Sequence, residues 1–175
     1  AQLAAHPGNA MVFFPSYAYL SRVDALLAAE GVPGAAILRE ARGLTEEEKN
    51  ALLGAFDKRD GRIVLLAVLG GAFAEGVDLA GERLQNVIVV STGLPQMDAR
   101  VRAMRRYHDE NGADGAFLCM TLPGMVRVIQ SAGRLIRTQS DHGALLLIDS
   151  RYQRGAERAL LSGTLIGDAL SGGSA

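Results

Sequence analysis

Two arginines and a glutamine share one face of a predicted helix in the last third of the chain. Gln130, Arg134 and Arg137 are spaced i, i+4 and i+7, and about 100° of rotation per residue places them on one narrow strip. Guanidinium groups stay charged and match phosphate oxygens two at a time. Gly133 leaves room for a ligand or a second backbone to approach. The spacing therefore favours an anion-binding face, and the alternative is a solvated face whose arginines pair with nearby acids.

A glycine-rich stretch, residues 70–81, carries a second group of candidate residues. Gly76 permits a tight turn between Glu75 and Asp78, whose carboxylates can accept hydrogen bonds from hydroxyl groups or from arginines. The stretch lacks both the GK[ST] ending of a Walker A loop and the GxGxxG pattern of a dinucleotide-binding loop. It is therefore not predicted to hold a phosphate chain by itself. The alternative is a connecting loop whose acids cap the following turn.

Two further polar segments could contact nucleic acid. Ser16 and Tyr17 open a predicted helix, where free backbone N–H groups, a hydroxyl and an aromatic ring could meet a phosphate and a base. A helix cap and a core residue are the alternative roles. The densest basic cluster could line a nucleic-acid path, or form a solvated face or a domain interface. It consists of Arg100, Arg102, Arg105 and Arg106.

The composition limits the class of protein. The chain of 175 residues is 49% hydrophobic, which is enough for one buried core. Its apolar runs are shorter than the ~20 residues that a membrane helix needs, and its start lacks the pattern of a secretory signal. One cysteine and three histidines without ligand spacing provide no disulfide, zinc or iron-sulfur site. We therefore expect a soluble, cytoplasmic or nucleoid-associated protein with no metal site in these residues.

The elements that position these residues alternate between apolar strands and helices. Strands are predicted over residues 10–14, 35–38, 62–69, 86–90, 115–120 and 144–149. Helices are predicted over residues 16–30, 45–56, 98–111 and 123–137, with a short helix after Gln153. This alternation predicts an α/β domain with a mostly parallel sheet of about six strands. Ligands of such sheets gather at the carboxyl ends of the strands, where the polar segments lie.

Three segments, in order, resemble the motifs of one family. QxxGRxIR, followed by D-x-G, an apolar strand and D-x-R, resembles motif VI of superfamily 2 DNA helicases of the XPD and DinG group. G-x-F-x-E-G-x-D, residues 71–78, is similar to motif V, and FFPSYAYL, residues 13–20, is similar to motif IV. The resemblance covers about residues 10–152, although residues 96–129 carry no distinctive match.

The resemblance implies the second motor domain of a helicase, a RecA-like three-layer α/β/α domain. Residues 1–160 would form this domain, and residues 161–175 would be the end of the C-terminal helix and a flexible Gly/Ser tail. In this family a first RecA-like domain carries Walker A, the Mg²⁺-binding acids and, in many members, an iron-sulfur cluster. This chain contains none of these. We therefore expect ATP and Mg²⁺ to be held mainly by an N-terminal RecA-like domain of the parent chain.

The same resemblance assigns roles to individual residues. The catalytic group comprises Arg134, Arg137 and Gln130. The nucleotide-binding residues are Glu75, Gly76 and Asp78. Single-stranded DNA is contacted by Ser16, Tyr17 and Gly71. Supporting roles fall to Asp149 and Arg151, for which a structural ion pair is the alternative.

The implied function is the second motor domain of an ATP-dependent DNA helicase with 5′ to 3′ polarity, of the repair or replication type. It would supply arginine fingers to ATP and contact single-stranded DNA, and the 175 residues alone would be inactive. The first alternative is a noncatalytic nucleic-acid-binding or scaffold module with a RecA-like fold, whose parent would lack an upstream GK[ST]. The second is a stand-alone α/β enzyme.

Overall fold

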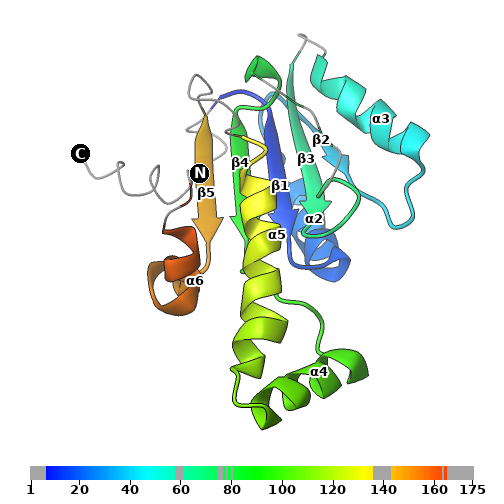
Figure 1. Cartoon of the computed structure of the whole chain (residues 1–175). Coiled ribbons are helices and arrows are strands. Elements are labelled where there is room, and N and C mark those ends of the chain that lie inside the picture. The colour runs from blue at the N-terminus through cyan, green and yellow to red at the C-terminus, as the bar shows by residue number, and fades with distance from the viewer. Residues whose placement is uncertain are drawn as a thin grey trace.

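Five parallel strands form one sheet in the order β2-β3-β1-β4-β5 (Figure 1). The computed structural model describes residues 7–57, 61–74, 77, 79, 81–135, 143–162 and 164. The strands are β1 (Ala10–Phe14), β2 (Ala35–Arg39), β3 (Arg62–Val68), β4 (Asn86–Val90) and β5 (Ala144–Ile148). β1 lies at the centre, with Ala10 level with Val64 of β3 and with Asn86 of β4. Because every pairing is parallel, all five carboxyl ends meet at one edge.

Helices cover both faces of the sheet, which gives the three layers that were predicted. The helices are α2 (Tyr17–Glu30), α3 (Glu46–Gly54), α4 (Ala99–Glu110), α5 (Leu122–Ala132) and α6 (Gly155–Leu161). α2 packs on one face through Leu20, next to Phe14 and Val68. The opposite face holds the larger core, which includes Met125 of α5 and Leu161 of α6. β1 and β3 are buried on both faces, which explains their continuous apolar sequences.

Local sequence signals set the beginnings of the helices. Ser16 caps α2, where its hydroxyl oxygen accepts a hydrogen bond from the N–H of Tyr19 at 3.2 Å. Thr45 and Glu48 form the predicted capping box of α3, with each side chain accepting from the other residue's backbone N–H. Asp98 caps α4, where its carboxylate accepts a hydrogen bond from the N–H of Val101 at 2.8 Å. These caps satisfy backbone donors that a helix leaves without intrahelical partners.

The strand predicted over residues 115–120 is wrong. Phe117–Thr121 form a π-helical turn that leads directly into α5, so the sheet has five strands rather than about six. Asp114 favours the helix, because its carboxylate accepts a hydrogen bond from the N–H of Phe117 at 2.8 Å. A short apolar run fits a buried helix as well as a strand, and periodicity alone does not separate the two.

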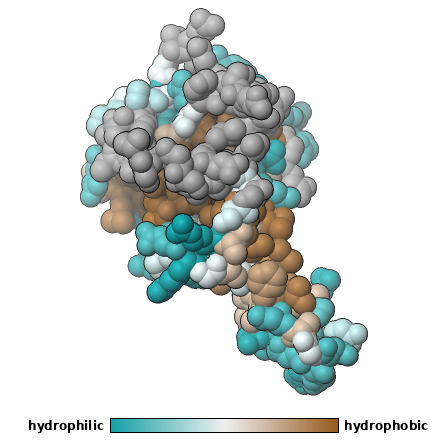
Figure 2. All heavy atoms as spheres, turned by 60° about the vertical axis from the view of Figure 1, so that its left-hand side comes forward, coloured by the Kyte–Doolittle hydropathy of each residue, from teal (hydrophilic) through white to brown (hydrophobic). Residues whose placement is uncertain are grey.

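α4 lies apart from the sheet, at the far end of the long helical segment that ends in α5 (Figure 1). No residue of α4 is buried. Figure 2 shows a hydrophilic surface at this end of the molecule and an apolar one on the segment that joins it to the body. Exposed apolar side chains of this region include Leu118 and Val126. No helix in the described part of the chain is long and apolar enough to cross a membrane.

Candidate functional site

The carboxyl edge of the sheet brings three loops together around a buried carboxylate. Glu40, which follows β2, is only 3% exposed. Its Oε1 atom accepts hydrogen bonds from the hydroxyl of Tyr17 at 2.7 Å and from the N–H of Ala72 at 2.8 Å. Its Oε2 atom accepts one from the N–H of Val68 at 2.8 Å. Glu40 was not among the residues predicted from the sequence, although a carboxylate directly after a predicted strand indicates a position at this edge.

Tyr17 and Gly71, two of the predicted DNA-binding residues, both contact this carboxylate. Burial of the phenol and its hydrogen bond to Glu40 raise the pKa of Tyr17 from its ordinary value of 10.0 to about 12. Arg42 covers the ring of Tyr17, with its guanidinium carbon 4.4 Å from the ring centroid. A Cβ atom at Gly71 would lie 2.2 Å from Oε1 of Glu40, which explains why this position is a glycine. Ser16, the third residue, is exposed beside them.

Arg134 holds the far part of the glycine-rich loop. Its guanidinium donates hydrogen bonds to the carbonyl oxygens of Val77, at 3.2 Å, and of Ala74. α5 ends at Ala132 and Gly133 caps it, so Arg134 lies in a turn beyond the helix rather than on a continuous helical face. Motif VI therefore meets motif V through an arginine and two backbone carbonyls.

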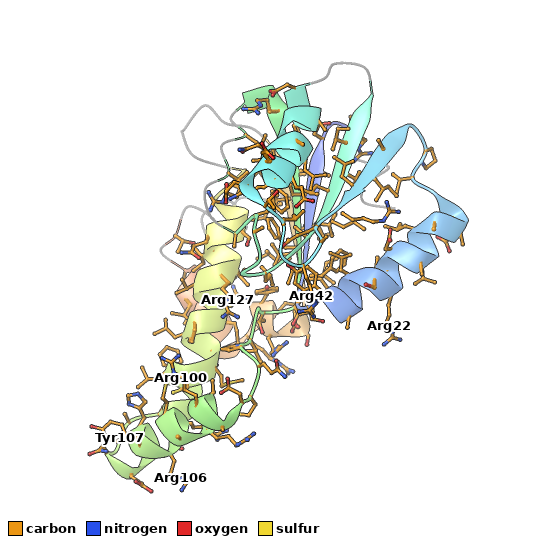
Figure 3. The ribbon with its side chains drawn as sticks, turned by 90° about the vertical axis from the view of Figure 1, so that its right-hand side faces the viewer. Arg22, Arg42, Arg100, Arg106, Tyr107 and Arg127 are labelled. Carbon is orange, nitrogen blue, oxygen red and sulfur yellow. The ribbon has the colours of Figure 1, made fainter. Side chains whose placement is uncertain are left out.

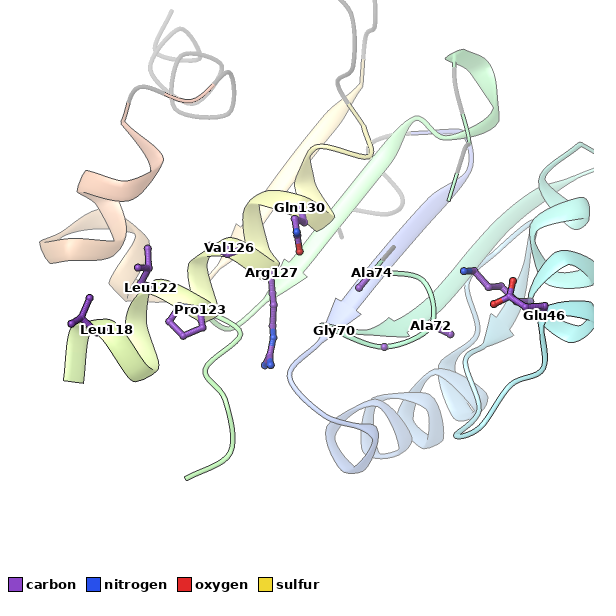
Figure 4. Close-up of a pocket in the computed structure, with 12 residues that line it drawn as sticks. Glu46, Gly70, Ala72, Ala74, Leu118, Leu122, Pro123, Val126, Arg127 and Gln130 are labelled. Carbon is purple, nitrogen blue, oxygen red and sulfur yellow. The ribbon is translucent and has the colours of Figure 1, made fainter. Parts of the chain in front are cut away.

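Four of the predicted site residues lie outside the described residues. They are Glu75, Gly76, Asp78 and Arg137. Gln130 lies in α5 and faces a cleft of about 1180 Å³ between α5, α3 and the loop after β3 (Figure 4). Arg127, which the sequence analysis did not select, extends from α5 into this cleft (Figure 4), and its Nη1 donates to the carbonyl oxygen of Gly93 at 3.3 Å.

Asp149 and Arg151 form an ion pair at the end of β5. Nη2 of Arg151 lies 2.7 Å from Oδ2 of Asp149, and Nε donates to Oδ1 at 2.9 Å. These hydrogen bonds hold the pKa of Asp149 below its usual value. Ser91, which follows β4, has a φ of 70°. Its Oγ accepts a hydrogen bond from Nη2 of Arg151, and its carbonyl oxygen accepts one from the hydroxyl of Tyr152. These hydrogen bonds brace the end of β4. Asp149 therefore contacts Arg151 and not Arg134 in the described hydrogen bonds.

The basic cluster of α4 lies away from these loops. Figure 3 places Arg100, Arg106 and Tyr107 on α4, at the lower left of the view, and Arg42 near its centre. Within the cluster, Nε of Arg105 lies 3.7 Å from a carboxylate oxygen of Asp109. Among the described residues, no group of three or more His, Cys, Asp or Glu side chains could hold a metal ion.

The family of the chain follows from its match to a known domain. The model of the helicase C-terminal domain family matches residues 1–165. The chain belongs to this family. This match, together with the relatives and structures that follow, confirms the predicted resemblance to DNA helicases of the XPD group. An ATP-dependent DNA helicase, chl-1, from Caenorhabditis elegans is 30% identical over 93% of the chain. A regulator of telomere elongation helicase 1 homolog from Anopheles gambiae is 33% identical over 89%.

These relatives are much longer proteins. The present chain covers 20% of the nematode helicase and 17% of the mosquito protein. Among solved structures, an apo structure of XPD superposes with a TM-score of 0.69 at 22% identity, over 87% of this chain and 30% of that one. The Xpd4 structure of S. tokodaii gives 0.58 at 22% identity, over 87% and 28%. The fold is therefore RecA-like, as predicted.

Proposed function

We propose that this chain is the second motor domain of an ATP-dependent DNA helicase and that Arg134 acts on the phosphoryl group of ATP. The observation that carries this proposal is the pair of hydrogen bonds that fix Arg134 against Ala74 and Val77 in motif V. A guanidinium held in place by the protein needs little reorganisation when charge develops on the transferring group. Family membership supports the assignment.

The nucleotide would be shared with another domain. The chain has no Walker A sequence, and its described residues contain no cluster that could hold a metal ion. We propose that an N-terminal RecA-like domain of the parent protein holds ATP and Mg²⁺, and that residues 1–160 close over them. Arg137 and Gln130 of motif VI, with Glu75, Gly76 and Asp78 of motif V, would complete the nucleotide site.

Single-stranded DNA would cross the carboxyl edge of the sheet. Ser16 offers an exposed hydroxyl at the start of α2, and Tyr17 and Gly71 lie on either side of the Glu40 carboxylate. Arg42 adds an exposed positive charge above the Tyr17 ring. A hydroxyl, a helix N-terminus and a guanidinium at one place suit the phosphates of a nucleic-acid backbone. The ion pair of Asp149 and Arg151 would support this edge by bracing β4.

ATP turnover by the complete helicase tests the proposed role of Arg134. Arg134→Ala is expected to lower DNA-stimulated kcat by about 10³-fold or more, the scale of an arginine finger. Arg154→Ala is the matched control, because Arg154 is exposed at the start of α6. Near-normal turnover by Arg134→Ala would contradict the proposal.

A further inference from the structure

Among the described residues, Glu40 is the only buried one with a charged side chain. A buried carboxylate is costly unless hydrogen bonds compensate for its lost hydration. Here three donors do so, and they come from different parts of the fold: the hydroxyl of Tyr17 and the backbone N–H groups of Val68 and Ala72. The carboxylate thus joins α2, the end of β3 and the loop that follows it.

Side chains of opposite charge hold the described residues that follow β3 at two places. Glu40 accepts from the N–H groups of Val68 and Ala72 at the first place. The guanidinium of Arg134 donates to the carbonyl oxygens of Ala74 and Val77 further along. Because only Phe73 separates Ala72 from Ala74, we expect a movement of Ala72 to strain the hydrogen bond between Arg134 and the carbonyl oxygen of Ala74.

The atoms packed around the Glu40 carboxylate leave the backbone at Gly71 little freedom to move. A Cβ atom at Gly71 would lie 2.2 Å from Oε1 and 2.9 Å from Cδ of Glu40. Close packing of this kind favours discrete arrangements over continuous deformation. A shift of Tyr17 must then be followed by Glu40 and by the backbone of residues 71 and 72.

We propose that Glu40 is a positioning residue that transmits the binding of single-stranded DNA at Tyr17 to Arg134 through the loop after β3. The inference rests on the proposed function and adds a residue outside motifs IV, V and VI. In this proposal Glu40 acts through Tyr17 and the backbone of Val68 and Ala72 rather than by touching either ligand. It sets the position of the loop on which both sites depend, so its loss weakens the coupling between the two ligands.

The coupling is measured with the complete helicase. The Kd for a fluorescein-labelled oligothymidylate is determined by anisotropy, without and with a saturating, non-hydrolysed ATP analogue, and the ratio of the two values reports the coupling. Tyr17→Phe removes one hydrogen bond of Glu40 and keeps the ring under Arg42. Glu40→Gln keeps the side chain's shape but places an NH₂ group, a donor, where one of the carboxylate oxygens accepts a hydrogen bond.

Tyr19→Phe is the matched control, because Tyr19 lies on the same helix, is 45% exposed and stacks on Phe14 through its ring. We expect the ratio to move at least about fivefold toward one in Glu40→Gln and in Tyr17→Phe, and to stay unchanged in Tyr19→Phe. A purely structural role would lower stability without changing the ratio.

An unchanged ratio in a folded Glu40→Gln protein would overturn the inference. If that variant does not fold, Tyr17→Phe decides, and an unchanged ratio there has the same consequence. A ratio of one in the wild-type helicase also overturns it, since no coupling would then exist to transmit. The proposed function is judged separately, by the ATP turnover of Arg134→Ala.

Discussion

Gly71 has no room for a side chain, because the Glu40 carboxylate occupies the space where a Cβ atom would lie. We predict that Gly71→Ala lowers the free energy of unfolding by about 1–3 kcal/mol, the range for forcing extra atoms into a packed site. Urea unfolding of the 175-residue chain measures the change. Gly54→Ala is the control, since no atom lies within 4 Å of the added Cβ. Its helical position predicts a gain of about 0.5–1 kcal/mol. Equal stability of the two variants would contradict the account.

The lowered pKa of Asp149 should make the free energy of unfolding depend on pH. Its pKa is lowered in the folded chain by the hydrogen bonds from Arg151, so its contribution is present above the unfolded pKa and is lost as the pH falls through the folded pKa. Asp149→Asn should therefore cost up to about 1 kcal/mol near pH 7, the upper end for a solvent-accessible pair, and less near pH 3. Urea unfolding at both pH values tests this. Glu110→Gln, at an exposed position of α4, is the control, and a cost for Asp149→Asn that does not depend on pH would contradict the prediction.

Residues of the motifs, such as Arg134, and residues that hold the motifs in place, such as Glu40, differ in how well the sequence predicts them. Arg134 was selected because of a helical spacing, but it lies beyond the end of α5, and its partners are backbone carbonyls of motif V. Backbone partners leave no mark in the sequence, because any residue supplies them. Glu40 was missed for a related reason. Two of its three donors are backbone N–H groups, and the third, Tyr17, lies 23 residues away.

At the scale of single elements, the capping box gives a clear prediction for α3. Thr45 and Glu48 satisfy each other's backbone N–H groups. Thr45→Ala should lower the free energy of unfolding by about 1 kcal/mol. Thr121→Ala serves as the control, since the Thr121 hydroxyl makes no cap hydrogen bond at the start of α5. If urea unfolding gave no larger loss for Thr45→Ala than for Thr121→Ala, the box would contribute nothing to α3.

Elements with strong local signals were predicted, and one with an ambiguous signal was not. β1, β3 and β4 were recognised from apolar runs bounded by turn residues, and α2 and α3 from their caps. Residues 115–120 have a similarly apolar sequence, but they follow Asp114, which accepts from the N–H of Phe117, and lie in the helical segment that connects α4 to α5. The order of the strands was not predicted, because pairing between distant segments depends on packing that the local sequence does not encode.

At the scale of the whole molecule, DNA binding should depend steeply on salt. Phosphate contacts release counterions, with a slope of about −0.7 in log Kobs against log salt for each contact on a single strand. Arg42→Ala in the complete helicase should reduce that slope by about one contact, because Arg42 is exposed beside Ser16 and Tyr17. Anisotropy of a labelled oligonucleotide over a range of salt concentrations measures it, with Arg154→Ala as the control. An unchanged slope would contradict a contact between Arg42 and a DNA phosphate.

In the proposed function, Arg134 stabilises the transferring phosphoryl group. The most direct measurement compares the affinity of the complete helicase for ADP alone with its affinity for ADP and aluminium fluoride, which together mimic the transition state. The wild-type protein should bind the mimic at least about 100-fold more tightly than ADP, and Arg134→Ala should lose most of that gain while its ADP affinity changes little. An Arg134→Ala protein that keeps the full gain would contradict the claim.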